Sequence, residues 1–261
     1  MTFDIYSVDL KKLNSLTKYP SIPTYHALGE RGKLSEAVQV NFANQFIIGT
    51  EKIDGTNARI ICFPEGYILG SREELLYAKG DLIGNPAMGI VEALKPLAER
   101  IYNKTVSNSI TVYYLEFYGG KITTASKNYT SKGTTGYKLF DCALIQNPEA
   151  LLTRRLEDIS LEREKGGKYF LPEESLSITA KDINVELTPR LFEADGAEFP
   201  QDIQATYKLL SDYSKSLSVL DSNSKGKSEG VVLRTKDRKA IAKLRFQDYE
   251  RTLNLKTKNQ S

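Results

Sequence analysis

Residues 51–57 read EKIDGTN and lie between two apolar runs that are typical of β-strands. The pattern predicts Lys52 at the end of one strand, with Asp54 two residues further on and Gly55 allowing close approach of the backbone. A lysine becomes a nucleophile once its ammonium loses a proton, and burial or neighbouring cations favour that loss. Taken alone the pattern is weak, because an ordinary surface turn explains it more simply.

A carboxylate and an aromatic residue follow at later strand positions. The stretch YLEFYGG at 114–120 places Glu116 among aromatic residues. A glutamate is rarely buried without a partner, so Glu116 is a candidate ligand for a hydroxyl or a metal unless it faces solvent. Phe140, in YKLFD at 137–141, could stack on a nucleotide base, although core packing is the simpler interpretation of this residue alone.

The last part of the chain adds a carboxylate and two cations. The stretch SEGVVLR at 228–234 puts Glu229 directly before an apolar strand. In AIAKLR at 240–245, strand alternation places Lys243 and Arg245 on one face. Two cations held side by side are costly unless an anion lies between them, so this strand is a candidate phosphate site. A solvated strand edge is the alternative.

The composition is that of a globular protein, with 261 residues of which 40% are hydrophobic and 26% charged. No apolar run approaches the ~20 residues that a membrane-spanning helix needs, and the N-terminus lacks a secretory signal pattern, so we expect a soluble, cytoplasmic protein. A monomer is the expected oligomeric state. Cys62 and Cys142 lie in apolar runs and are expected to be buried free thiols. The single histidine, His26, argues against a histidine-rich zinc site or a Ser-His-Asp triad.

Basic residues gather towards the C-terminus. Residues 234–258 hold nine basic and three acidic side chains, whereas residues 149–198 hold seven basic and twelve acidic ones. A basic segment suits a polyanionic partner, either nucleotide phosphates or a nucleic-acid backbone, and a solvated basic tail is the alternative.

Periodicity and turn residues predict an α+β fold with mostly antiparallel sheets flanked by helices. A short helix is expected from residue 10 to a point before Pro20, then a loop over 20–32. Further helices are expected at 86–102, 149–159 and 200–217. Strands are expected at 45–50, 57–63, 67–70, 110–118 and 137–145, and as a hairpin at 231–235 and 239–245.

In this order, the short elements resemble the signature motifs of the covalent nucleotidyltransferase superfamily of ATP-dependent ligases and mRNA capping enzymes. Within it the sequence is most similar to the RNA ligase 2-like group, through KIDGTN and the preceding Glu51. Asp54 departs from that group, many of whose members carry histidine there, and matches DNA ligases. The resemblance implies a single ATP-grasp-like nucleotidyltransferase domain over 1–261. Residues 1–45 would be an N-terminal extension packed on it, and no C-terminal oligonucleotide-binding domain is expected.

The resemblance implies the activity of an ATP-dependent RNA ligase. Lys52 would attack ATP to form lysyl-AMP, the AMP would pass to a 5′-phosphate RNA end, and a 3′-hydroxyl end would then attack. Lys243 and Arg245 would hold the α-phosphate and favour loss of the Lys52 proton. Glu229 would bind Mg²⁺, with Mn²⁺ as a substitute, and Asp54 would orient Lys52 or assist the sealing step.

The resemblance also implies nucleotide contacts for five more residues. Phe140 would stack on adenine, and Glu51 would read its exocyclic amine. Glu116 would contact the ribose or share the Mg²⁺, and Asn57 would contact pyrophosphate or the strand end. Arg72 matches an arginine that contacts ribose or phosphate in related ligases, although simple solvent exposure explains it equally well.

Alternative functions remain open at this stage. A small ATP-dependent DNA ligase would differ in its sealing of nicked duplexes with DNA on the 3′-hydroxyl side. A capping guanylyltransferase would be labelled by GTP instead of ATP. An inactive nucleic-acid-binding module of the same fold would retain RNA without any covalent nucleotide adduct. For the ligase, RNA is expected to contact the basic surface and the lysine-bearing loop from 121 to 138.

Overall fold

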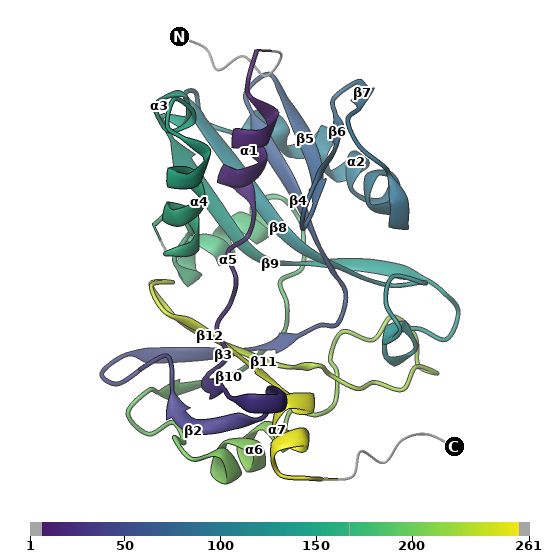
Figure 1. The fold of residues 1–261 in the computed structure, drawn as a ribbon. Coiled ribbons are helices and arrows are strands. Elements are labelled where there is room, and N and C mark those ends of the chain that lie inside the picture. Colours follow the sequence, from purple (N-terminus) through teal and green to yellow (C-terminus); the bar gives the residue numbers. More distant parts are fainter. Residues whose placement is uncertain (1–6, 167, 256–261) are drawn as a thin grey trace. The chain divides into compact units, whose positions relative to one another are not determined.

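The computed structural model describes residues 7–166 and 168–255. The chain divides into two compact units, each assembled from three separate stretches of sequence (Figure 1). The first unit takes its described residues from 1–21, 55–117 and 136–187, and the second from 22–54, 118–135 and 188–261. Antiparallel sheets combined with helices confirm the predicted α+β class.

The first unit is built on a six-stranded sheet in the order β7-β6-β5-β4-β8-β9. β4 lies near the middle and pairs antiparallel with both β5 and β8. Both faces of β4 are buried, since adjacent residues such as Ile60 and Ile61 are fully covered. The strands are β4 (Thr56–Phe63), β5 (Gly66–Ser71), β6 (Leu75–Ala78), β7 (Asp81–Leu82), β8 (Ser109–Gly119) and β9 (Thr135–Gln146).

Five helices accompany this sheet in the described residues: α1 (Leu10–Thr17), α2 (Ile90–Ile101), α3 (Pro148–Leu152), α4 (Leu156–Glu164) and α5 (Glu173–Asp182). α1 lies against α4, and α2 packs on β4 and β5 (Figure 1). Leu13 and Leu16 of α1 enter the same core as Tyr114 of β8. The buried Arg59 of β4 donates to the Asn14 carbonyl, which ties α1 to the sheet. Residues 10–17 are therefore an integral part of this unit.

The second unit contains a four-stranded antiparallel sheet in the order β10-β3-β11-β12. Its core gathers Tyr25, Phe42, Leu233, Leu244 and Tyr249. The strands are β3 (Phe46–Lys52), β10 (Arg190–Asp195), β11 (Gly230–Thr235) and β12 (Ile241–Arg245), beside the small pair β1 (His26–Leu28) and β2 (Leu34–Val38). The helices are α6 (Ile203–Ser211) and α7 (Phe246–Thr252).

Most predicted elements are confirmed within a few residues, but some predictions are wrong. Residues 20–32 were expected as a loop and contain β1, and the helix expected at 200–217 ends at Ser211. β10 and α5 were not predicted at all. β10 is only half-buried and is stabilised by pairing with the distant β3, a contact that local periodicity does not report. Short 3-10 turns lie at Glu30–Gly32, Ala87–Gly89, Tyr102–Lys104 and Ser126–Asn128.

The cysteines and the histidine belong to the interior. Cys62 and Cys142 are buried free thiols, as predicted, and burial raises the pKa of both. His26 is fully buried, with Nδ1 2.7 Å from the Tyr249 hydroxyl and Nε2 2.8 Å from the Gln201 carbonyl. Both ring nitrogens therefore have partners within the core. No helix in the described part of the chain is long and apolar enough to cross a membrane.

Candidate active site

Three strands of the second unit align the predicted nucleophile with the predicted phosphate-binding cations. Lys52, at the end of β3, lies opposite Gly230 of β11, which lies opposite Arg245 of β12. Residues directly opposite one another point to the same face of a sheet, as do alternate residues of one strand. Lys52, Lys243 and Arg245 therefore share one face of the four-stranded sheet.

Glu229 places its carboxylate beside Lys52. The Nζ atom of Lys52 lies 2.6 Å from Oε2 of Glu229, and the two side chains are 24% and 23% exposed. The backbone N–H of Glu229 also donates to the Lys52 carbonyl at 3.2 Å, so the main chain holds the two residues together. The Lys52 ammonium and the Glu229 carboxylate therefore form an ion pair that both their side chains and their main chains hold in place.

Gly230 is required by the close approach of β11 to β12. A β-carbon at this position would lie 2.0 Å from the carbonyl oxygen of Leu244 and 2.9 Å from Cα of Arg245. These are backbone atoms, which cannot swing aside as a flexible side chain could. The missing side chain also leaves the sheet face clear between Lys52 and Arg245.

The two cations of β12 have different surroundings. Arg245 donates to Asp248 from Nε at 2.8 Å and from Nη2 at 3.1 Å, and Asp248 is only 2% exposed. Lys243 is held through its backbone, because its N–H donates to the Pro23 carbonyl and its carbonyl accepts from Tyr25. An anion was expected beside these two cations. For Arg245, the carboxylate of Asp248 takes that place.

Glu51 lies on the opposite face of β3 from Lys52 and is 2% exposed. Its carboxylate accepts hydrogen bonds from the Ser216 hydroxyl, from the Leu217 N–H at 2.9 Å and from the Ser218 hydroxyl at 3.0 Å. Both oxygens are therefore engaged by residues 216–218. The predicted contact of Glu51 with the adenine amine stays a prediction, and it would require a nucleotide on the Glu51 face and the replacement of these hydrogen bonds.

Asp54 is held by a buried tyrosine. Its backbone N–H donates to the Tyr129 hydroxyl at 2.7 Å, and its carbonyl accepts from Thr123 at 3.4 Å. Burial raises the pKa of Tyr129, and the negative charges of Glu51, Asp54 and Glu229 contribute in the same direction. Tyr129 is therefore a stable neutral support for the segment that carries the nucleophile.

The first unit contains the other predicted contact residues. Asn57 of β4 lies directly opposite Glu116 of β8, so the two side chains share one face. Glu116 accepts a hydrogen bond from the Gly55 N–H at 3.0 Å. The Oδ1 atom of Asn57 is buried and finds no hydrogen-bond partner among the described residues. A buried polar atom without a partner is consistent with the predicted contact to a bound ligand.

Phe140 stands in an aromatic cluster of the first unit. Its ring packs edge-on against Tyr19 at a centroid distance of 4.9 Å, and Tyr114 lies 6.3 Å away. The Tyr19 hydroxyl also donates to Asp141 at 2.8 Å. Tyr19 thus contacts both residues of the aromatic-Asp motif. Arg72, by contrast, is 62% exposed and pairs with the adjacent Glu73 at 3.4 Å.

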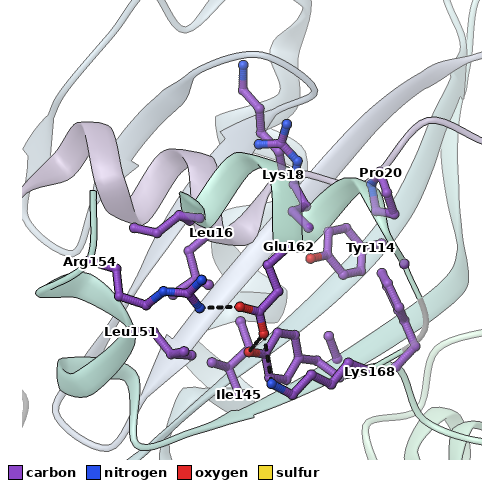
Figure 2. A pocket seen from close by; sticks show the side chains of 15 residues that line it. Leu16, Lys18, Pro20, Tyr114, Ile145, Leu151, Arg154, Glu162 and Lys168 are labelled. Atoms are coloured by element: carbon purple, nitrogen blue, oxygen red, sulfur yellow. Dashed lines mark hydrogen bonds and ion pairs between the residues drawn. The ribbon is translucent and has the colours of Figure 1, made fainter. Parts of the chain in front are cut away.

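A pocket in the first unit lies apart from these residues, since none of the predicted site residues lines it (Figure 2). Its wall is mostly apolar, with Leu16, Tyr114 and Ile145 among the lining residues. Arg154 and Lys168 both pair with Glu162 at this pocket. The lining cations Lys18, Arg154, Arg163 and Lys168 outnumber the single lining carboxylate of Glu162.

The carboxylates of the predicted site suit Mg²⁺ only if a bound nucleotide supplies further oxygen ligands. In residues 7–166 and 168–255, no group of three or more His, Cys, Asp or Glu side chains is placed to hold a metal. Mg²⁺ commonly binds one or two carboxylates together with substrate phosphates and water. Glu229, beside Lys52, and Glu116 offer such oxygens, each from its own unit.

The RNA ligase family model matches residues 45–245 of this chain, a range that includes all the predicted site residues. The chain therefore belongs to the RNA ligase family. A search of curated proteins found no match.

Solved structures of RNA ligases have a similar fold. The Naegleria gruberi RNA ligase with PPi is 15% identical, with a TM-score of 0.51, over 90% of this chain and 64% of its own. A mutant of that ligase with ATP and Mn is 14% identical, with a TM-score of 0.54, over 90% and 62%. An archaeal ATP-dependent RNA ligase is 16% identical, with a TM-score of 0.54, over 89% and 49%. This chain thus spans less than two-thirds of each of these proteins.

Several residues that support the site were not found from the sequence. Asp248 follows Arg245 at a spacing of three, which is a recognisable signal for a helical ion pair. No such signal exists for Tyr19, Tyr129, Ser216 and Ser218, because their partners lie far away in sequence.

The lysine-bearing loop predicted at 121–138 is shorter in the structure, because β9 begins at Thr135. Lys138 lies within β9, pairs with Glu186 and is only 12% exposed.

Proposed function

We propose that this chain is an ATP-dependent RNA ligase that joins 5′-phosphate and 3′-hydroxyl RNA ends through a lysyl-AMP intermediate. The observation that carries the proposal is the contact of Lys52 with Glu229 on the sheet face that also presents Lys243. Family membership supports it, as do the N. gruberi ligase structures with PPi and with ATP and Mn.

The chemistry follows from the order of the groups. The deprotonated amine of Lys52 attacks the α-phosphorus of ATP, a P–N bond forms, and the P–O bond to pyrophosphate breaks. A 5′-phosphate oxygen of RNA then displaces the lysine and takes the AMP. The 3′-hydroxyl of the second end loses its proton, attacks the 5′-phosphorus and releases AMP as the phosphodiester forms.

Charge neutralisation and positioning are the main demands of such steps. Lys243 supplies a cation for the α-phosphate and favours loss of the Lys52 proton. Asn57 and Glu116, side by side on β4 and β8, would contact nucleotide oxygens. Glu229 would offer a carboxylate oxygen to a Mg²⁺ bound together with the nucleotide, and that ion would neutralise phosphate charge. In this proposal both units belong to one nucleotidyltransferase domain, which acts as a monomer.

The proposal is tested by incubating the protein with α-labelled ATP and Mg²⁺, followed by denaturing electrophoresis and intact-mass measurement. We expect a covalent adduct of one adenylate, and its complete absence would contradict the proposal. Comparing the sealing of nicked duplexes that carry RNA or DNA on the 3′-hydroxyl side then shows which nucleic acid the enzyme prefers on that strand. Preferential sealing of DNA would show that the protein is a DNA ligase and not an RNA ligase. Labelling by GTP alone would indicate a guanylyltransferase.

A further inference from the structure

Two segments of the second unit bring exposed lysines close in sequence or by hydrogen bonds to the residues around Lys52. The segments 119–135 and 212–229 hold six lysines, no arginine and three acidic residues. Backbone hydrogen bonds join them: the Lys225 N–H donates to the Lys127 carbonyl at 3.2 Å, and the Gly226 N–H donates to the Asn128 carbonyl at 2.8 Å. A bridge between Lys215 and Lys227 pairs the two arms of the second segment.

The lysines face solvent, whereas most of the acidic side chains are engaged. Lys127, Lys215, Lys225 and Lys227 are all exposed. The carboxylate of Asp221 accepts from the Thr130 hydroxyl and from the Ser131 N–H and hydroxyl, and Glu229 pairs with Lys52. Desolvation pushes the pKa of Asp221 up, but hydrogen bonds from Ser131, Thr130 and Asn223 outweigh it and hold that pKa below its usual range.

The same segments support the residues around the nucleophile. The Tyr129 hydroxyl accepts from the Asp54 N–H, and the Tyr129 carbonyl accepts from the Leu220 N–H at 2.7 Å. Glu229, whose N–H donates to the Lys52 carbonyl, follows Lys227 by two residues. The segments that carry these lysines are therefore joined directly to the backbone around Lys52.

We infer that Lys127, Lys215, Lys225 and Lys227 form a surface that binds the phosphodiester backbone of the RNA strand beside its reacting end. The inference rests on the proposed function, which supplies the polyanionic partner. Lysine ammonium groups contact phosphates without reading bases, so this surface contributes affinity that depends on salt and not on sequence. Lys138, buried in a pair with Glu186, does not belong to it.

The test compares two double variants of the full chain. Lys215→Gln with Lys225→Gln removes two charges from the surface. The pairing of these segments uses main-chain atoms of the two lysines, which the substitutions keep. The matched control is Lys181→Gln with Lys208→Gln, which removes two exposed lysines from α5 and α6. Fluorescence anisotropy with a 5′-phosphorylated single-stranded RNA oligonucleotide measures Kd between low and moderate KCl.

We expect the surface variant to bind RNA more weakly at low salt and to lose about 1.4 from the slope of log Kd against log salt, since each contact to single-stranded RNA contributes about 0.7. The control should keep the wild-type slope. Equal slopes in wild type and surface variant, or equal losses in both variants, would overturn the inference. Labelling by ATP is measured in parallel and should be unchanged. Loss of labelling in the wild type would contradict the proposed function, and not this surface.

Discussion

Glu51 and Lys52 are neighbours in the chain and point to opposite faces of β3, so that one is buried among serines while the other pairs with Glu229. Strand alternation explains the separation, because successive side chains leave a strand in opposite directions. Lys52 thus faces the side with Lys243, and the carboxylate of Glu51 holds residues 216–218 on the other side.

Lys52→Ala should abolish covalent labelling by ATP and leave folding almost unchanged. The side chain is partly exposed and its ion pair contributes at most about 1 kcal/mol to stability. Denaturing electrophoresis with α-labelled ATP measures the first effect and thermal unfolding the second. Lys208→Ala, at an exposed position of α6, is the control and should be labelled normally. A labelled Lys52→Ala protein would show that the nucleophile is another residue.

Glu229→Gln should reduce labelling by roughly 10²–10³-fold, the size of effect found when one preorganised electrostatic contact to a transition state is removed. The amide keeps the shape of the side chain, but it loses the negative charge that pairs with Lys52 and would bind a cation. Glu198→Gln, exposed in the same unit, provides the comparison. Similar labelling rates in the two variants would remove Glu229 from the site.

Lys243→Ala should also abolish labelling, whereas Lys243→Arg should retain part of it because the charge is kept. The backbone bonds of Lys243 to residues 23–25 do not depend on its side chain, so both variants should fold. The labelling rate is measured at saturating ATP. Substantial activity in the alanine variant would contradict a role in holding the phosphate.

Glu51→Gln should destabilise the protein by about 1–3 kcal/mol, because a buried carboxylate with three donors becomes an amide that cannot satisfy them all. Urea unfolding measures this loss, and Ser218→Ala should show a smaller one. Neither variant should change the preference for ATP over ITP. A collapsed preference with unchanged stability would support the interpretation that Glu51 reads the adenine amine.

Acid should destabilise the first unit through Glu162. Hydrogen bonds from Lys168, Arg154 and Tyr169 hold its pKa at about 2, below the value of about 4.3 expected in the unfolded chain. Since the folded pKa is the lower one, the stabilisation is present above pH ~4.3 and is lost as the pH falls towards ~2.

Thermal unfolding followed by circular dichroism tests this pH dependence. The midpoint temperature of unfolding should decrease as the pH is lowered from 5 to the lowest accessible value. In Glu162→Gln this decrease should be smaller. Glu65→Gln, in the exposed turn between β4 and β5, should leave the profile unchanged. Parallel profiles for wild type and Glu162→Gln would contradict the prediction.

Local sequence patterns were sufficient for much of this protein. Apolar, β-rich runs bounded by turn residues predicted β4, β5 and β8. Strand alternation placed Lys243 and Arg245 on one face, because the period of a strand depends only on the chain itself. The nucleophile motif was recognisable for the same reason, since its residues are consecutive.

Long-range packing set the remaining features. Glu51 meets Ser216 across 165 positions of sequence, and Lys225 meets Lys127 through backbone atoms that carry no residue-type signal. Strand β10 likewise pairs with β3, although the two strands are far apart in the sequence. Such contacts depend on how folded segments meet in space. The hydrogen bonds that residues 216–218 make to Glu51, and the pairing of segments 119–135 and 212–229, could therefore not be derived from composition or periodicity.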